Sequence, residues 1–301
     1  MKPITLLIEQ LLVCSIIMAF LSGFIFFQPV GEPIVSNPVP LKGGIPKIFL
    51  MVVDGLRQDH VLTLHSDIDD GGSASIRFFG DDTWSAMFPG HFVFADPVSS
   101  FFVSDYTEVD RNVSRHLRSL FNGSEELASW DVAILHYLGL DHIGHSHGSK
   151  HRLIDDKLTQ MSNVVRAANL RLEASGCNYL ILVCGDHGML DEGGHGGSSY
   201  EELHTAAVFM GPRVESRKSR EQLMIRQVDL SSTLAVLSGV SVPASSVGVP
   251  LLSLLSPLVD AYDLLQLYKS EAKRLLHILE AASLPAGQIL VLWGETYFHF
   301  P

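Results

Sequence analysis

A carboxylate and an imidazole stand side by side at Asp186 and His187, with a glycine on each side of the pair. The apolar run of residues 179–184 directly before them is short and partly β-branched, which predicts a buried strand. In open α/β sheets, ligands bind outside the carboxyl ends of the strands. Because Asp and His side chains both coordinate zinc, the two residues are candidate metal ligands at one edge of a sheet.

Two further apolar runs also end near a carboxylate. Residues 48–53 lead directly into Asp54. Residues 131–137 lead into a short segment that contains Asp141 and His145. Because the carboxyl ends of parallel strands meet at one edge of a sheet, we expect all of these side chains to lie at the same edge.

A glycine-rich loop after the first pair adds one more imidazole, that of His195. The strand ends and this loop together offer six candidate metal ligands: Asp54, Asp141, His145, Asp186, His187 and His195. Two divalent ions about 4 Å apart need a mixed set of oxygen and nitrogen ligands of this kind. Each motif alone has an ordinary explanation, such as a turn at Asp54 or a solvated face at Asp141. Their shared position at strand ends favours a site for two divalent ions, with zinc as the expected metal.

The elements that position these residues alternate along the chain between strand and helix patterns. Strands are predicted at residues 48–53, 76–82, 131–137, 179–184 and 205–210. Helices are predicted at residues 109–121, 153–174, 229–238 and 260–282. Strands that alternate with helices predict an α/β fold, with a mostly parallel sheet between layers of helices.

The N-terminus has the pattern of a transmembrane anchor. Residues 11–27 carry no charged side chain, and with residues 4–8 the apolar stretch approaches the roughly 20 residues that span a bilayer. The segment that follows has no clear small-residue cleavage motif, which favours an uncleaved signal anchor over a signal peptide. Only Lys2 and the free amine are positive before it, so we expect a cytosolic N-terminus and a lumenal chain.

Composition supports this organisation and narrows the partners. We divide the chain into a signal anchor (1–28), a Pro- and Gly-rich linker (29–46), a lumenal domain (47–256), and a helix with a divergent tail (257–301). The Asn-x-Ser triplets at Asn112 and Asn122 are candidate glycosylation sites that agree with a lumenal location. Three cysteines do not make a disulfide framework. A net charge of −12 argues against nucleic acid as a partner.

Four longer segments make the chain recognisable. They are Val-Val-Asp-Gly-Leu-Arg (52–57), Phe-Phe-Val-Ser-Asp-Tyr-Thr-Glu-Val-Asp (101–110), His-Tyr-Leu-Gly-Leu-Asp-His-Ile-Gly-His (136–145) and Gly-Asp-His-Gly-Met (185–189). These segments closely resemble the GPI ethanolamine phosphate transferases, a family of the alkaline-phosphatase-like superfamily. The resemblance covers residues 46 to about 255, and it implies the superfamily fold, a mostly parallel sheet between helices.

The resemblance also implies roles for the candidate ligands. One group matches the ligands of the ion that activates the nucleophile: Asp54, Asp186 and His187. The other group matches the ligands of the second ion: Asp141, His145 and His195. The remaining histidines of these motifs are left as supporting or structural residues, and His204 is the alternative to His195.

The family reaction moves phosphoethanolamine from phosphatidylethanolamine to a mannose of the GPI anchor precursor. A threonine attacks the donor phosphorus, and the mannose hydroxyl then resolves the phospho-enzyme. The resemblance therefore implies these two lipids as substrates and the endoplasmic reticulum membrane as the location, with the bulk of the chain in the lumen.

The chain departs from the family pattern at the nucleophile. The family threonine lies in a Pro-Thr-x-Thr-x-Pro-like helix start between the first two strands, where this chain has only residues 55–75 and no such motif. The hydroxyl side chains in this shorter connection are Thr63, Ser66, Ser73 and Ser75. The short connection and a tail unlike the family's lead us to expect an incomplete domain with impaired transfer.

Two other functions stay open. One is a phosphodiesterase or hydrolase of the same superfamily, which turnover of a chromogenic phosphodiester would favour. The other is a membrane-tethered, non-catalytic lumenal module that binds metal or a partner subunit, which metal binding without turnover would favour.

Overall fold

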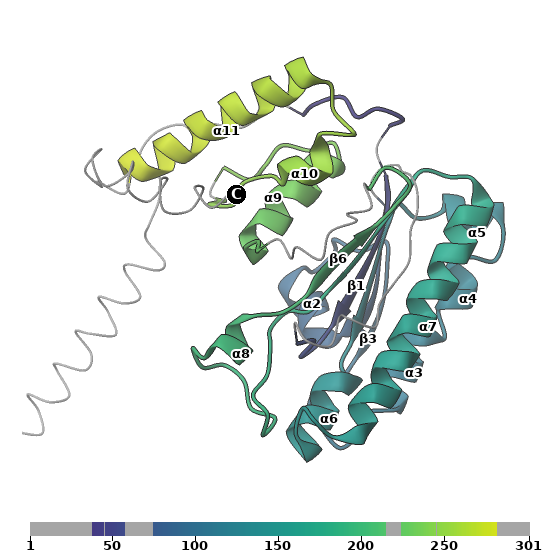
Figure 1. Cartoon of the computed structure of the whole chain (residues 1–301). Coiled ribbons are helices and arrows are strands. Elements are labelled where there is room, and N and C mark those ends of the chain that lie inside the picture. The colour runs from purple at the N-terminus through teal and green to yellow at the C-terminus, as the bar shows by residue number, and fades with distance from the viewer. Residues whose placement is uncertain (1–37, 45, 58–74, 215–223, 245, 282–301) are drawn as a thin grey trace, which may run out of the picture.

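A six-stranded sheet forms the centre of the molecule, in the order β3-β2-β4-β1-β5-β6 (Figure 1). The computed structural model describes residues 38–44, 46–57, 75–214, 224–244 and 246–281. The strands are β1 (Lys47–Val53), β2 (Ile76–Asp81), β3 (Phe94–Val98), β4 (Val132–Tyr137), β5 (Tyr179–Cys184) and β6 (Ala207–Met210). The pairs are parallel except that of β5 and β6, which is antiparallel. The expectation of an α/β fold around a mostly parallel sheet is confirmed.

Several predictions from the sequence concern residues outside this described part. They are the signal anchor at 1–28, most of the linker, the last part of the tail from residue 282, and the hydroxyls of Thr63, Ser66 and Ser73. Among the helices that are described, none combines the length and the apolar character needed to cross a membrane.

The central strand β1 is buried on both faces because its sequence is almost continuously apolar. Side chains alternate across a strand, so Phe49, Met51 and Val53 join the large core on one face. Val52 points the other way and joins a smaller cluster with Leu182 of β5.

Helices cover both faces of the sheet (Figure 1). On the side of the large core lie α3 (Glu108–Ser114), α4 (Leu117–Leu120), α5 (Ser124–Ala128), α6 (Gly139–His147) and α7 (Arg152–Ser175). On the other side lie α2 (Asp82–Met87), α9 (Gln227–Leu237), α10 (Leu252–Leu255) and α11 (Ala261–Ala281). The short α8 (Tyr200–Leu203) belongs to the connection between β5 and β6.

Two local differences from the sequence prediction have clear causes. The edge strand β3 was not predicted, because Pro97 interrupts its short pattern and proline is a weak strand signal. The helix predicted over 109–121 is two helices, α3 and α4. At the break between them, Arg115 Nη2 and His116 Nε2 lie 2.5 and 2.6 Å from Asp96 Oδ2 of β3.

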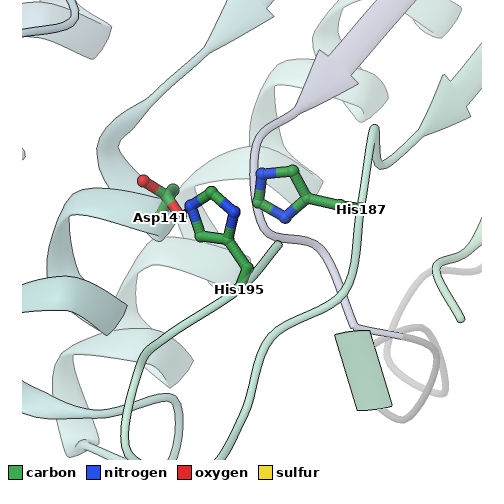
Figure 2. Close-up of side chains that lie close together, drawn as sticks. All are labelled: Asp141, His187 and His195. Carbon is green, nitrogen blue, oxygen red and sulfur yellow. Dashed lines mark ion pairs between the residues drawn. The ribbon is translucent and has the colours of Figure 1, made fainter. Parts of the chain in front are cut away.

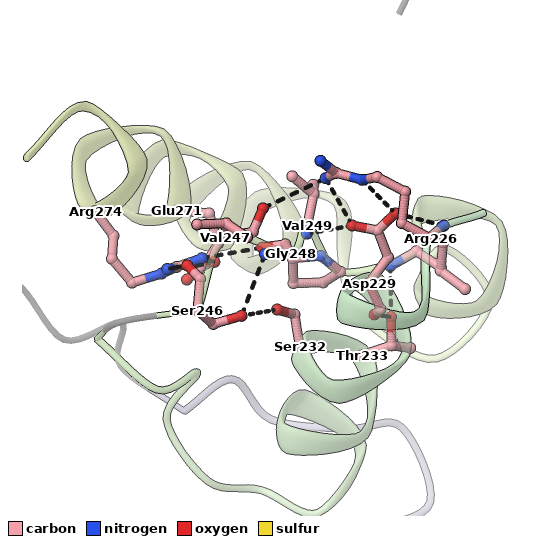
Figure 3. A network of polar contacts seen from close by, with 12 residues as sticks. Arg226, Asp229, Ser232, Thr233, Ser246, Val247, Gly248, Val249, Glu271 and Arg274 are labelled. Carbon is pink, nitrogen blue, oxygen red and sulfur yellow. Dashed lines mark hydrogen bonds and ion pairs between the residues drawn. The ribbon is translucent and has the colours of Figure 1, made fainter. Parts of the chain in front are cut away.

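A buried arginine attaches α11 to the rest of the fold (Figure 3). Arg274 is 1% exposed, and its guanidinium donates to the backbone carbonyls of Ser246 and Gly248 and to the Glu271 carboxylate. Asp229 of α9 accepts a hydrogen bond from the same loop. The apolar face of α11 joins a cluster that also contains residues of β5 and α9. The helix is therefore part of the packed structure.

Candidate metal centre

The six ligands predicted from the sequence converge at one edge of the sheet. Strand β1 is paired in parallel with β4 on one side and with β5 on the other, so the carboxyl ends of these strands meet. Asp54 follows β1; Asp141 and His145 lie on α6, after β4; Asp186 and His187 follow β5; and His195 lies in the loop before α8.

Asp54, Asp186 and His187 form one group of donor atoms. His187 Nε2 lies 3.2 Å from Asp54 Oδ1 and 3.8 Å from Asp186 Oδ2. Ligand atoms of a tetrahedral zinc ion, each about 2.0 Å from the metal, stand about 3.3 Å apart. The other oxygen of Asp186 accepts hydrogen bonds from the backbone N–H groups of Gly55 and His187, at 3.3 and 2.9 Å. These bonds orient the carboxylate, and the two distances from His187 Nε2 are close to those between ligands of one divalent ion. Donor atoms of His187 also lie within 4.8 Å of those of Asp141 and His195, so His187 stands between the two groups.

Asp141, His145 and His195 form a second group. His145 Nε2 lies 3.4 Å from Asp141 Oδ2, and His195 Nε2 lies 3.5 Å from Asp141 Oδ1. The two imidazole nitrogens are 2.9 Å apart. Asp141 and His145 are one helical turn apart on α6, so the helix itself places both side chains on one face.

The two groups are in direct contact. The rings of His187 and His195 stack with their centroids 3.8 Å apart and an interplanar angle of 18° (Figure 2). Asp141 Oδ1 is buried and forms no hydrogen bond, which leaves a desolvated carboxyl oxygen that a cation would satisfy. This orphaned oxygen and the mixture of carboxylate and imidazole donors fit divalent ions such as zinc.

The shifted pKa values of the carboxylates indicate that negative charge exceeds positive charge in the site. Burial and the nearby charge of Asp54 raise the pKa of Asp141 to about 7. The same two causes raise the pKa of Asp186. Although burial opposes it, the contacts of Asp54 with His187 and His136 keep the pKa of Asp54 below its usual value. Three carboxylates in this small volume therefore compete for few cationic groups.

His187 is oriented with one nitrogen toward the carboxylates. Its Nδ1 donates a hydrogen bond to the carbonyl of Gly188 at 2.9 Å, because a carbonyl can only accept. Burial lowers the pKa of His187, but the contacts with Asp54 and Asp186 outweigh this and raise it to about 9. In the metal-free site a proton therefore lies on Nε2, at the position where a metal ion would bind instead.

The N-terminus of α6 is held by a buried ion pair. Asp110 of α3 accepts hydrogen bonds from the backbone N–H groups of Leu138 and Gly139, at 3.1 and 2.9 Å. The other carboxylate oxygen of Asp110 lies 2.7 Å from Lys157 Nζ of α7. A Cβ at Gly139 would collide with both charged groups, so glycine is needed there. This cap sets the position of the helix that carries Asp141.

Arg57 ties together the loops that surround the centre. It is 9% exposed, and its guanidinium donates to the Met189 carbonyl and to Asp191 Oδ1, each at 2.9 Å, and to Ser149 Oγ at 3.1 Å. The loops after β1 and β5 and the turn between α6 and α7 thus share one buried cation.

His136, which lies within β4 beside the first group, was not among the residues predicted from the sequence. His136 is 5% exposed, and its Nε2 lies 3.7 Å from Asp54 Oδ2 and 4.0 Å from Asp186 Oδ2. The available signal was a single imidazole in the otherwise apolar strand of residues 132–137. Such a residue is usually a satisfied core histidine, so periodicity alone could not assign it to the site.

Other predicted residues lie apart from the two groups. His204 stacks on Tyr200 with ring centroids 3.7 Å apart, and its Nδ1 donates to the Tyr200 carbonyl, whereas His195 contacts Asp141. Both cysteines of the described part are free thiols. Of the glycosylation candidates, Asn122 is exposed in a turn, whereas Asn112 is partly buried on α3.

Ser75, the one described hydroxyl of the β1–β2 connection, lies at the opposite edge of the sheet. It precedes β2, whose first residue pairs with Val132, and its hydroxyl donates to Asp131 Oδ2 at 3.0 Å. Asp54 follows β1, whose last residue pairs with Tyr137. The strand from Val132 to Tyr137 spans about 17 Å. Ser75 is therefore too far from the metal centre to attack a substrate held there.

With this geometry, the chain belongs to the type I phosphodiesterase/nucleotide pyrophosphatase family, whose model matches residues 49–226. The curated relatives are more specific. The chain is 41% identical over 246 residues to GPI ethanolamine phosphate transferase 2, catalytic subunit, of Homo sapiens, covering 78% of this chain and 24% of that protein. It is 40% identical over 198 residues to GPI ethanolamine phosphate transferase 2 of Saccharomyces cerevisiae, covering 58% of this chain and 24% of the relative.

The chain thus spans about a quarter of the length of these two relatives. Among solved structures, a sulfatase-like protein from Bacteroides thetaiotaomicron aligns with a TM-score of 0.52 at 13% identity, covering 70% of this chain and 74% of that one. This likeness supports the fold only.

Proposed function

We propose that the chain carries the metal centre of a phosphoethanolamine transferase of GPI anchor synthesis. The donor is phosphatidylethanolamine and the acceptor is a mannose hydroxyl of the GPI precursor. The observation that carries the proposal is the convergence of two carboxylate–imidazole groups, in which every predicted ligand except His195 lies within the four segments that resemble the family. The names of the relatives support the same reaction class.

Each residue of the centre has a task in this proposal. Asp54, Asp186 and His187 would hold one zinc ion, and Asp141, His145 and His195 would hold the other. When bound, such ions neutralise phosphate oxygens and lower the pKa of an attacking hydroxyl. The chain itself contributes by holding the ligand side chains in fixed orientations. Backbone N–H groups orient the Asp186 carboxylate, and the Gly188 carbonyl orients His187.

The same proposal includes an impaired transfer step. In the family reaction, a threonine oxygen forms a bond to phosphorus as the bond from phosphorus to the diacylglycerol oxygen breaks, and the mannose hydroxyl then displaces the threonine. The family's threonine motif is missing from residues 55–75. Ser75 lies at the far end of β2. We therefore infer a centre that binds metal and phosphate but does not form the phospho-enzyme.

The proposed location follows from the same relatives and from the N-terminal sequence. We infer that residues 1–28 anchor the chain in the endoplasmic reticulum membrane and that the α/β domain faces the lumen. The exposed Asn122 would then be available to the lumenal glycosylation machinery.

A transfer assay tests the function. The full chain is expressed in cells that lack the full-length enzyme, and incorporation of labelled phosphoethanolamine into GPI precursors is measured. We expect no restoration, and no covalent label on the purified zinc-loaded chain. Restoration would contradict the impairment, and a labelled residue would identify another nucleophile. Turnover of a chromogenic phosphodiester that Asp186→Asn abolishes would instead support a hydrolase.

A non-catalytic metal-binding module is the second candidate. The observation that favours it is the position of Ser75. Its hydroxyl donates a hydrogen bond to Asp131 at the edge of the sheet opposite the metal centre, so it cannot act as the nucleophile there. Two equivalents of bound zinc, with no turnover and no binding of a phosphodiester, would support this function, because the impaired transferase would still bind phosphate. A purified fold that binds no metal would exclude both candidates.

A further inference from the structure

Trp84 and His136 form a hydrogen bond beside the candidate metal centre. Trp84 Nε1 lies 3.1 Å from His136 Nδ1. The indole ring is fixed in turn by stacking on Phe78, with centroids 5.4 Å apart and an interplanar angle of 22°. An indole N–H can only donate, so His136 Nδ1 must be the acceptor and carries no proton.

The proton of His136 is therefore on the other nitrogen. A neutral imidazole with a bare Nδ1 carries its hydrogen on Nε2. This nitrogen is buried, forms no hydrogen bond, and lies 3.7 Å from Asp54 Oδ2 and 4.0 Å from Asp186 Oδ2. It is thus a desolvated donor aimed at two carboxylates. A nitrogen that carries a proton has no lone pair to offer to a metal ion.

His187 has the opposite arrangement. Its Nδ1 donates to the Gly188 carbonyl, so that Nε2 is the nitrogen left to exchange its proton for a metal ion. Two imidazoles therefore face the same pair of carboxylates with different tasks. Distance alone does not show which of the two imidazoles is the metal ligand, because donor atoms of Asp54, His136 and Asp186 also lie within 4.8 Å of one another.

The backbone of β2 permits this contact. Gly80 lies against His136, and a Cβ at Gly80 would come within 2.5 Å of the His136 carbonyl oxygen and 2.6 Å of its Cβ. The glycine lets the end of β2, and with it Trp84 on the following helix, approach β4 closely.

We propose that His136 is a positioning residue, which Trp84 locks in the Nε2–H form so that its N–H faces Asp54 and Asp186 without binding metal itself. The attraction between this N–H and the two carboxylates, 3.7 and 4.0 Å away, would hold them in the orientation that one ion requires. Loss of such supporting contacts typically weakens metal binding 10- to 100-fold. The inference rests on the proposed function only for the presence of the ion. The tautomer is a property of the metal-free chain.

The tautomer can be measured directly. Two-bond proton–nitrogen NMR correlations of the ¹⁵N-histidine-labelled full chain report which ring nitrogen carries the proton, and His136→Gln assigns the signal by its loss. We expect the Nε2–H form with and without zinc, and a mixture of both forms in Trp84→Phe, which keeps a ring but lacks the N–H. A pure Nδ1–H form in the parent chain, or a zinc-bound His136 nitrogen, would overturn the proposal.

Two substitutions of His136 separate donation from ligation. Glutamine places an amide N–H near the position of Nε2, whereas methionine fills similar space without a donor. Chelator competition should show two zinc ions in His136→Gln with affinities within about threefold of the parent. In His136→Met, the affinity for one of the two zinc ions should fall about 10- to 100-fold. Loss of a full zinc equivalent in His136→Gln, with an unchanged melting temperature, would show that His136 is a ligand.

If the parent chain binds no zinc, the proposed metal function fails. The NMR measurement on the metal-free chain still decides the tautomer, so the two failures are distinguishable.

Discussion

At the scale of single residues, the main feature of the centre is the crowding of its carboxylates. Three carboxylates and three imidazoles lie within a few ångströms of one another, and the side chains of Asp54 and Asp141 are the most buried of the six. Burial and mutual repulsion raise the pKa of Asp141 and Asp186. A divalent cation relieves that repulsion, and it must displace protons to do so.

Metal affinity should therefore rise with pH. Asp141, with a pKa of about 7, and His187, with a pKa of about 9, are both protonated at pH 6 in the metal-free site. Each displaced proton changes the affinity about tenfold per pH unit. We expect the combined affinity for both zinc ions to change by roughly two decades per pH unit below pH 7 and by roughly one between pH 7 and 9. Chelator competition measures it, and an affinity that does not change from pH 6 to 9 would contradict this charge balance.

The residues with a strand-end position were predictable from the sequence. Asp54 and Asp186 directly follow buried apolar runs, and parallel pairing brings such positions together. Asp110 and Arg57 were not predictable as supports, because their partners are distant in sequence and no local pattern pairs them. The role of His136 depends on one indole hydrogen bond, which only the three-dimensional structure reveals.

At the scale of elements, α6 is a short helix whose position depends on a cap from another helix. Asp110 supplies the acceptor for the first N–H groups of α6, and Lys157 neutralises it without access to water. Helix N-termini are stabilised by such acceptors, and the macrodipole favours a negative charge there.

Asp110→Asn should weaken zinc binding as well as stability. The substitution leaves Lys157 as a buried charge without its partner, and breaking a buried pair in this way typically costs about 3–5 kcal/mol. Chemical unfolding and zinc titration of the full chain measure the two effects. Arg111→Ala on the same helix is the matched control, because its ion pair with Glu108 is exposed. If Asp110→Asn has normal zinc affinity and its free energy of unfolding falls by less than about 1 kcal/mol, the cap does not position α6.

At the scale of the whole molecule, the helices that cover the two faces of the sheet are attached differently. Helix α7 packs through an apolar stripe on the large core, as its periodicity predicted. Helix α11 is also amphipathic, and its burial includes the Arg274–Glu271 pair under the loop at Ser246 (Figure 3). Periodicity predicted the length of α11, whereas the loop that its arginine binds could not be deduced from the helix sequence.

Arg274→Met should destabilise the fold by about 3–5 kcal/mol, because Glu271 is then left buried without a partner. The double variant Arg274→Met with Glu271→Met should lose much less free energy of unfolding, since no unpaired charge remains. Lys269→Met, an exposed change on the same helix, serves as the control. The free energy of unfolding of the full chain distinguishes these variants. Equal losses in the single and double variants would show that the backbone contacts of Arg274, and not the ion pair, dominate.

The topology proposed for the whole chain makes a separate prediction. If the α/β domain faces the lumen, the chain carries a glycan at the exposed Asn122. Treatment with an endoglycosidase should then shift the electrophoretic mobility of the parent chain. It should not shift that of the double variant, which carries both Asn112→Gln and Asn122→Gln. An unshifted parent chain from cells with active glycosylation would argue against lumenal exposure of this surface.

The metal content of the purified full chain tests the central claim most directly. After dialysis against zinc and removal of free ion, atomic absorption should give two zinc ions per chain. Asp141→Asn should lower this to about one, and His204→Gln, which alters a histidine outside the two groups, should leave it at two. A parent chain with no bound zinc, or an Asp141→Asn chain that keeps both ions, would contradict a two-ion centre at this edge of the sheet.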